Sequence, residues 1–203
     1  MKIDKVMRMA PVIPVLVVHD AAHGLPIAQA LVRGGLPVLE VTMRTEAALD
    51  VIREMSKCKG AFVGAGTVHN EKQLDAAIDA GAKFIVSPGL TKPLAKAAID
   101  RGIPFLPGIA TAADTMRGLD LGLDHFKFFP AETSGGIKAL KALAAPFYQC
   151  RFCPTGGITA DSAPDWLALD AVLCVGGSWL VPTGDPDPAG IETRARAAAA
   201  LAQ

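Results

Sequence analysis

Apolar runs separated by glycines recur along this chain at nearly even intervals. Five glycines precede such runs, namely Gly35, Gly60, Gly81, Gly102 and Gly122, and successive members lie 25, 21, 21 and 20 residues apart. Each glycine follows a stretch with helical periodicity, such as NEKQLDAAIDA or TKPLAKAAID. This pattern is typical of helices that end at a left-handed glycine and lead into a strand. We therefore predict a series of alternating helices and strands.

The apolar runs predict eight strands with helices between them. Further runs at PVIPVLVV, RFCPTG and DAVLCVGGS complete the series. The predicted strands cover residues 12–18, 36–42, 61–65, 83–87, 103–107, 124–129, 151–155 and 170–175. Eight consecutive strand–helix units predict an α/β fold, a (β/α)8 TIM barrel in one domain over residues 1–203. An open doubly wound sheet uses the same units, but the even spacing and the strand count favour the barrel.

Both ends of the chain carry further helical patterns. Residues 2–9 predict a short helix that would close the bottom of the barrel. The Ala-rich segment GIETRARAAAALAQ, residues 190–203, predicts a final helix. The segment before it, VPTGDPDPAG, is rich in proline and glycine, and we expect a loop there.

Composition and charge narrow the functional class. The chain has 203 residues, 51% of them apolar, and a formal net charge of zero, which suits one domain with a sizeable core. Balanced charge and the lack of any basic run of five or more residues argue against nucleic-acid binding. The apolar stretch near the N-terminus is interrupted by Pro14 and lacks a cleavage site, and no stretch has the length of a membrane span. We therefore expect a cytoplasmic protein without nucleic-acid or membrane partners.

Four cysteines raise the question of metal or redox chemistry. Cys150 and Cys153 form a C-x-x-C, a spacing found in zinc sites and redox motifs. The sequence has no second pair and no nearby histidine, and Cys153 lies in an apolar run. We therefore interpret these two thiols, together with Cys58 and Cys174, as buried structural residues.

One lysine lies among three phenylalanines in the segment FKFFPAE, residues 126–132. Strand alternation directs Phe126 and Phe128 toward the helices, and Lys127 and Phe129 inward. An amine attacks a carbonyl only when it is unprotonated, and burial lowers the pKa of lysine side chains. Lys127 is therefore a candidate nucleophile, although a lysine that extends from the rim into solvent would fit the same pattern.

A carboxylate is predicted to face the same interior. In EVTMR, on the second predicted strand, Leu39 and Val41 belong toward the helices, so Glu40 and Thr42 face inward. Arg44 follows just past the end of this strand, where TIM barrels place their active sites. Glu40 and Arg44 could form a structural ion pair, but an inward carboxylate in a packed barrel needs a reason.

Two glycine turns follow the last two predicted strands, TGGI at 155–158 and GGS at 176–178. In TIM barrels these loops often hold phosphate on main-chain N–H groups, and glycine permits the close approach. One glycine pair would be weak evidence, but two after consecutive final strands indicate a phosphate site. With an inward lysine, glutamate and an arginine, they suggest Schiff-base chemistry on a phosphorylated keto acid.

Other functions fit the same features. A different phosphate-binding barrel enzyme could use Lys127 as an electrostatic clamp, and a catalytically silent barrel could bind a sugar phosphate. A metal-dependent aldolase is a weaker alternative, because His19, His23, His69 and His125 are scattered without ligand spacing.

Several segments of the chain resemble one known family. GLPVLEVTMR (35–44) and GLDHFKFFPAETSG (122–135) are similar to two signature segments of the 2-keto-3-deoxy-6-phosphogluconate (KDPG) aldolases, class I aldolases also described as 4-hydroxy-2-oxoglutarate (KHG) aldolases. GAGTV (64–68), SPG (87–89), PTGGI (154–158) and GGSWL (176–180) also resemble that family, in the expected order. The resemblance covers nearly the whole chain. One departure is Met43, where the family more usually has Leu or Phe, and this side chain should point toward the helices.

The resemblance implies an activity and a role for each candidate residue. It implies a homotrimer that needs no metal and no cofactor, and that reversibly cleaves KDPG to pyruvate and glyceraldehyde 3-phosphate in the Entner–Doudoroff pathway. Lys127 would form the Schiff base, and Glu40 would be the general acid and base. The other implied contacts are Arg44 and Thr67 to the pyruvyl carboxylate, Pro88 and Phe129 to the pyruvyl part, Gly156, Gly157, Gly177 and Ser178 to phosphate, and Thr155 to a substrate hydroxyl.

Overall fold

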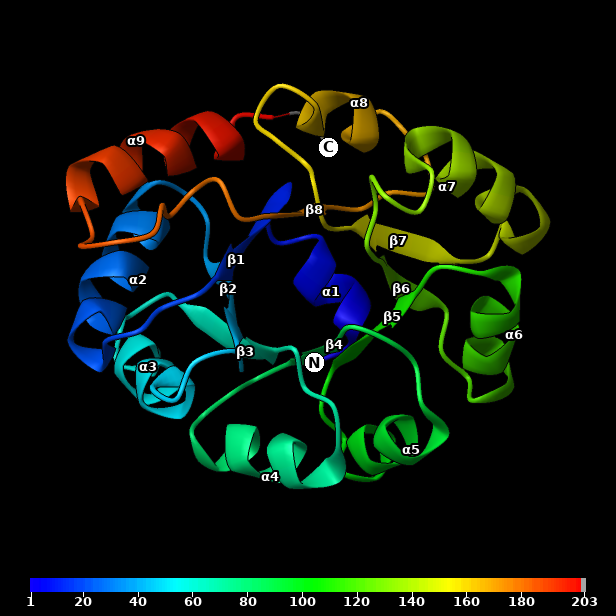
Figure 1. Ribbon diagram of the computed structural model, residues 1–203, viewed down its shortest axis with the longest axis horizontal. Coiled ribbons are helices and arrows are strands. Elements are labelled where there is room, and N and C mark those ends of the chain that lie inside the picture. Colours follow the sequence, from blue (N-terminus) through cyan, green and yellow to red (C-terminus); the bar gives the residue numbers. More distant parts are fainter. Residues whose placement is uncertain (202–203) are drawn as a thin grey trace.

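Parallel strands form a barrel with helices around it (Figure 1). The computed structural model describes residues 1–201. The strands within that range are β1 (Val12–Leu16), β2 (Val38–Thr42), β3 (Phe62–Gly66), β4 (Ile85–Ser87), β5 (Phe105–Ile109), β6 (His125–Phe128), β7 (Arg151–Pro154) and β8 (Val175–Gly177). They pair in the order β7-β6-β5-β4-β3-β2-β1-β8. Two isolated parallel bridges, Phe152 to Val172 and Thr155 to Gly176, join the ends of this row. The predicted TIM barrel is therefore confirmed.

The helices fill the connections between strands. They are α1 (Ile3–Met7), α2 (Gly24–Arg33), α3 (Ala48–Ser56), α4 (Glu71–Asp79), α5 (Lys92–Asp100), α6 (Ala112–Asp120), α7 (Gly136–Ala144), α8 (Ala163–Leu167) and α9 (Pro188–Ala199), with 3-10 turns η1 (Ala21–His23) and η2 (Ala145–Phe147). The five glycines that punctuate the sequence pattern all have positive φ, between 64° and 103°. Glycine adopts this conformation without the steric clash that other residues suffer, which explains its place at each of these turns. No helix within residues 1–201 is long and apolar enough to cross a membrane.

The buried apolar side chains form two cores, one on either side of the barrel wall. The outer core lies between strands and helices and includes Leu39, Val41, Phe126 and Phe128. Partly buried Met43 packs against this outer core, on the side predicted for it. The inner core is a separate cluster that fills the lower half of the barrel. Its buried members are Val6, Met7, Ile13, Val38, Phe84, Val86, Leu106, Cys153, Leu173 and Cys174.

The helix α1 closes the bottom of the barrel, as residues 2–9 predict. Val6 and Met7 are fully buried in the inner core, and Figure 1 shows α1 inside the ring of strands. His125, at the lower end of β6, contacts Asp4 of this helix with Nε2 and Oδ1 3.1 Å apart. The pKa of Asp4 is lowered, because hydrogen bonds and charge from His125 and Arg8 outweigh the opposing effect of burial.

The eighth strand is the element that the sequence pattern misplaces. Residues 170–175 were expected to form it, but β8 begins at Val175 and includes both glycines of GGS. The backbone of the preceding residues pairs with β7 at an isolated bridge at Val172, and regular pairing with β1 starts at Val175. The final helix α9 begins at Pro188, inside the expected loop. The expected end of that helix at residues 202–203 lies outside the described residues.

Candidate active site

A lysine and a glutamate meet inside the upper half of the barrel. Lys127 of β6 and Glu40 of β2 are only 5% and 3% exposed, and Lys127 Nζ donates a hydrogen bond to Glu40 Oε1 at 3.0 Å. The interpretation of Lys127 as a rim residue that extends into solvent is therefore wrong. A buried ion pair is costly unless its geometry is good, and here each charge has its opposite within contact distance.

The pair lies in a cavity of about 130 Å³ at the carboxyl ends of the strands. Its lining residues are Val15, Glu40, Thr42, Arg44, Thr67, Pro88, Lys127, Phe129 and Thr155. Seven of these nine are predicted site residues, drawn from segments between residues 40 and 155 of the chain. Thr42 also lines the cavity, on the side that strand alternation predicts for it. Val15 was not predicted, although its register opposite Glu40 across β1 and β2 brings it into the site.

Aromatic and apolar groups cover the lysine. The Nζ atom of Lys127 lies 5.3 Å from the ring centroid of Phe129, within the range of a cation–π contact. Phe126 and Phe128, its other aromatic neighbours in the sequence, face the helices instead. The Phe128 ring packs against Trp166 of α8, with centroids 6.4 Å apart. The phenylalanines on either side of Lys127 therefore anchor the strand. Of the three phenylalanines in FKFFPAE, Phe129 is the one that lines the cavity with the amine.

Arg44 is held at the mouth of the cavity. Its Nε donates to Thr42 Oγ1 at 3.2 Å, and that hydroxyl donates to the carbonyl oxygen of Leu16 at 2.8 Å. Thr42 therefore orients the guanidinium. No ion pair joins Arg44 to Glu40 in the described part of the chain, where Glu40 pairs with Lys127. The alternative of a Glu40–Arg44 structural pair is thus wrong, and the exposed guanidinium can take a carboxylate bidentately.

The end of β3 combines a close approach with a strained backbone. A Cβ atom on Gly66 would lie 2.2 Å from Glu40 Oε1, so only glycine leaves room for that carboxylate. Thr67 follows with φ of 61°, the single non-glycine residue with positive φ in the range 1–201. Such conformations are uncommon for a β-branched residue and cluster at functional sites. This backbone brings Thr67 into the cavity wall.

The two glycine segments differ in structure. Gly156 and Gly157 have φ of 105° and 81°, which makes a turn after β7. Gly176 and Gly177 instead belong to β8, and only Ser178 follows the strand. A Cβ atom on Gly176 would lie 2.3 Å from Thr155 Oγ1, so the two segments approach closely. The main-chain N–H groups of Gly156, Gly157 and Ser178 have no acceptor within residues 1–201 and can bind an anion.

The four cysteines are buried and free. Cys150 belongs to the outer core and Cys153 to the inner core, so the C-x-x-C residues lie on opposite sides of the strand. Burial, with a contribution from the charge of Asp124, raises the pKa of Cys150 to about 11. Burial and a hydrogen bond with Cys153 raise the pKa of Cys174. The interpretation of these thiols as structural residues agrees with their burial.

Two further features of the described residues bear on other kinds of site. Within residues 1–201, no three His, Cys, Asp or Glu side chains come together in a way that could hold a metal ion.

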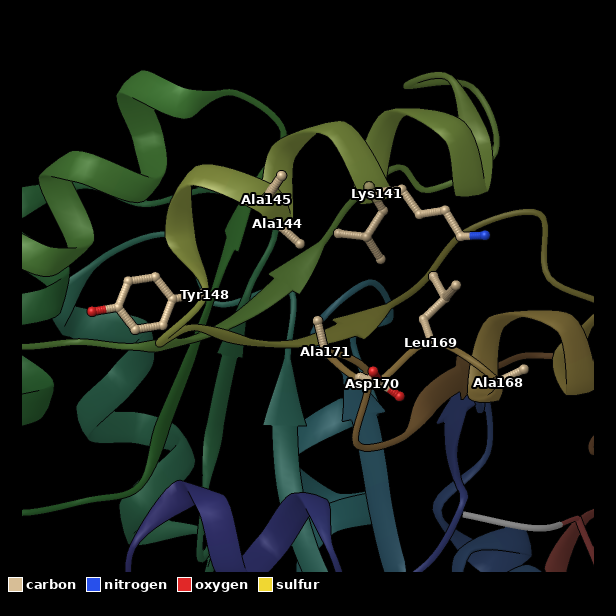
Figure 2. Close-up of a pocket in the computed structure, with 9 residues that line it drawn as sticks. Lys141, Ala144, Ala145, Tyr148, Ala168, Leu169, Asp170 and Ala171 are labelled. Atoms are coloured by element: carbon tan, nitrogen blue, oxygen red, sulfur yellow. The ribbon is translucent and has the colours of Figure 1, made fainter.

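A groove of about 460 Å³ lies on the outside of the barrel, between α7 and residues 168–171 (Figure 2). Tyr148 beside it is 83% exposed, and none of the predicted site residues lines this groove.

Comparisons with known proteins identify one family. The family model "KDPG and KHG aldolase" matches residues 3–193. The 2-dehydro-3-deoxy-phosphogluconate aldolase of Zymomonas mobilis is 60% identical over 199 residues, which cover 98% of this chain and 96% of that protein. The KHG/KDPG aldolase of Escherichia coli K12 is 56% identical over 180 residues, 88% of this chain and 84% of that protein.

Solved structures agree with the sequence comparisons. The KDPG aldolase of Zymomonas mobilis ZM4 with 3-phosphoglycerate superposes with a TM-score of 0.98 at 59% identity, covering 99% of this chain and 96% of that chain. The KDPG aldolase of Legionella pneumophila, with pyruvate captured as a covalent carbinolamine intermediate, gives 0.95 at 40% identity, covering 98% and 99%. The chain therefore belongs to the KDPG and KHG aldolase family.

Proposed function

We propose that this protein is a class I aldolase that reversibly cleaves KDPG to pyruvate and glyceraldehyde 3-phosphate. We also propose 4-hydroxy-2-oxoglutarate, which yields pyruvate and glyoxylate, as a second substrate. The observation that carries the proposal is the buried contact between Lys127 Nζ and Glu40 Oε1, 3.0 Å apart, in a cavity beside Arg44. The captured carbinolamine of the Legionella relative supports covalent chemistry, and the 3-phosphoglycerate of the Zymomonas relative supports a phosphorylated ligand.

The contact between the two side chains supplies the proton transfers that Schiff-base formation requires. Glu40 can take a proton from the ammonium of Lys127, and the free amine attacks the C2 ketone. Glu40 returns this proton to the hydroxyl of the resulting carbinolamine, which leaves as water. This step gives a protonated imine and restores the carboxylate of Glu40. Because both groups are almost fully buried, bulk water has little access to compete for these protons.

Carbon–carbon cleavage follows from the same geometry. Glu40 removes the proton of the C4 hydroxyl, the C3–C4 bond breaks, and its electron pair moves into the imine, which becomes an enamine. Glyceraldehyde 3-phosphate leaves as the aldehyde. Glu40 then returns its proton to C3, and hydrolysis of the imine releases pyruvate and restores the amine of Lys127.

The remaining cavity residues orient the keto acid. Arg44 and Thr67 hold the pyruvyl carboxylate, and the arginine fork suits bidentate contact with it. Phe129 and Pro88 pack on the pyruvyl part and exclude water from the imine. Thr155 contacts a substrate hydroxyl. The N–H groups of Gly156, Gly157 and Ser178, which have no acceptor within residues 1–201, support a phosphate site at the far end of the substrate, next to Gly177.

The resemblance to the family also supports an assembly and a cellular context. We infer a homotrimer that works in the cytoplasm, on phosphorylated keto acids of the Entner–Doudoroff pathway. Light scattering during size-exclusion chromatography tests the assembly, since a trimer has three times the mass of the chain. A particle with the mass of one chain would contradict it.

Trapping with borohydride tests the proposed chemistry. Reduction in the presence of pyruvate should fix an adduct on the peptide that contains Lys127, and Lys127→Ala should lose both the adduct and nearly all pyruvate release from KDPG. The double variant Lys127→Ala/Glu40→Gln is a folding control, because it removes both charges of the pair and leaves no buried unpaired charge. Its barrel should remain folded. An unlabelled wild-type peptide, or Lys127→Ala with wild-type turnover, would overturn the assignment.

A further inference from the structure

Glu132 connects the strand of Lys127 to the glycine turn after β7. It follows β6 by four residues, in the segment FKFFPAE. Its main-chain N–H donates to the carbonyl oxygen of Gly156 at 3.1 Å, while the neighbouring Ala131 N–H donates to the carbonyl oxygen of Thr155 at 2.8 Å. The segment after β6 thus runs alongside the segment that carries the phosphate-binding N–H groups.

The Glu132 side chain packs directly beneath this turn. A Cβ atom placed on Gly157 would lie 2.6 Å from Glu132 Cγ and 2.8 Å from its Cβ, which means that the methylenes fill the space beside the glycine. The carboxylate is fixed as well, because Glu132 Oε1 accepts a hydrogen bond from Trp166 Nε1 at 3.0 Å. Trp166 is fully buried on α8 and packs on Phe128 of β6.

We propose that Glu132 and Trp166 are positioning residues for the turn at Gly156 and Gly157, and that they thereby set the preference for phosphorylated over unphosphorylated keto acids. The proposal rests on the phosphate site assigned under the proposed function. The buried indole of Trp166 fixes the Glu132 carboxylate by a hydrogen bond. The methylenes of Glu132 are thereby held against Gly157, and they keep the turn in the conformation that presents its N–H groups. Neither residue lines the cavity around Lys127, so the common chemical steps should not depend on them.

An acidic residue beside a phosphate site needs a physical explanation. Its charge opposes an anion, so the contact can help phosphate binding only through geometry. The hydrogen bond from Trp166 Nε1 supplies that geometry. It holds the Glu132 carboxylate in place because the buried indole N–H would carry a free-energy penalty without an acceptor. The interaction is therefore expected to tolerate the loss of the charge but not the loss of the acceptor and the methylenes.

Three variants separate these contributions. Glu132→Ala removes both the acceptor and the methylenes, and should lower kcat/KM for KDPG about ten-fold through KM, with kcat/KM for 4-hydroxy-2-oxoglutarate unchanged. Trp166→Phe removes the indole N–H together with part of the buried ring system, and keeps one aromatic ring against Phe128. It should lower kcat/KM for KDPG relative to kcat/KM for 4-hydroxy-2-oxoglutarate, as Glu132→Ala does. Glu132→Gln keeps an acceptor and the methylenes, and should stay within about two-fold of wild type.

The controls distinguish this inference from the phosphate site itself. Asp120→Ala, at the end of α6 and so at the opposite end of the barrel, should leave the ratio of the two kcat/KM values unchanged. A wild-type protein with no preference for the phosphorylated substrate would overturn the phosphate site and this proposal together. A wild-type preference that Glu132→Ala and Trp166→Phe both retain would overturn the positioning role alone, as would a loss in Glu132→Gln as large as that in Glu132→Ala. Should Glu132→Ala not fold, Trp166→Phe and Glu132→Gln decide the matter.

Discussion

Replacement of Gly66 by alanine should disable the site although every reacting group is retained. The new methyl would lie 2.2 Å from Glu40 Oε1 and 2.6 Å from Glu40 Cγ. Ordinary contact begins near 3.4 Å, so the carboxylate would have to withdraw by about 1.2 Å. The backbone of Gly66 does not have positive φ, and alanine therefore adds no strain of its own.

The expected size of the effect follows from that displacement. A misplacement of about 1 Å at a reacting centre costs about 100-fold in rate. Because Glu40 moves every proton in the proposed mechanism, we expect kcat for KDPG cleavage to fall by about that factor in Gly66→Ala. Borohydride trapping with pyruvate should still label Lys127, since the amine keeps its place, but the labelling should be slower.

Gly64 provides a matched control on the same face of β3. A Cβ atom there would lie 2.4 Å from the ring of fully buried Phe84, below the reacting groups. Gly64→Ala should therefore cost about 1–3 kcal/mol of stability by overpacking, and keep kcat in the folded fraction. Urea unfolding and steady-state pyruvate release measure the two quantities. A folded Gly66→Ala with wild-type kcat would refute the steric reasoning and weaken the role of Glu40.

Two further predictions concern substrate binding and acid stability. Arg44→Lys loses the bidentate fork and should weaken pyruvate binding about ten-fold in product-inhibition assays, whereas unchanged affinity would count against the carboxylate role. Asp114 forms a capping box with Thr111 at the start of α6, and its pKa is lowered because hydrogen bonds from Thr111 and from the N–H groups of Ala110 and Thr111 outweigh burial. Its stabilisation should be complete at neutral pH and lost as the pH falls below about 4, so urea unfolding should show Asp114→Asn about 1 kcal/mol less stable at pH 7. A deficit that persists unchanged at pH 3 would contradict this linkage.

Local patterns predict the barrel and the inward residues well because both depend on short-range geometry. Helix ends with left-handed glycines and the two-residue period of a strand can be read from neighbouring positions. The boundaries of β8 could not be read from neighbouring positions. In the sequence GGS looks like a turn, whereas in the fold Gly176 and Gly177 pair with Ile13 and Pro14 of β1. Pairing across the whole chain length decides that boundary.

Contacts between distant segments are the part of the site that local patterns do not predict. Val15 enters the cavity through its register with Glu40, and the Trp166 indole reaches Glu132 from another helix. In the sequence, Trp166 looks like an ordinary apolar residue of α8. The ion pair of Lys127 with Glu40, rather than of Arg44 with Glu40, also depends on a separation of 87 positions that only the closed barrel brings to 3.0 Å.

The size of the cavity explains how one site could use two different substrates. At about 130 Å³ it is smaller than the roughly 300 Å³ or more of pockets that enclose drug-sized ligands, so it suits the keto-acid end of the substrate alone. That end is common to KDPG and 4-hydroxy-2-oxoglutarate, and all proposed proton transfers take place there. In the proposed arrangement, the rest of a longer substrate extends past Thr155 toward Gly156, Gly157 and Ser178, outside the cavity. Reaction and substrate preference are therefore assigned to separate parts of the barrel, and a change at the glycine turn can alter the preference while Lys127 and Glu40 stay in place.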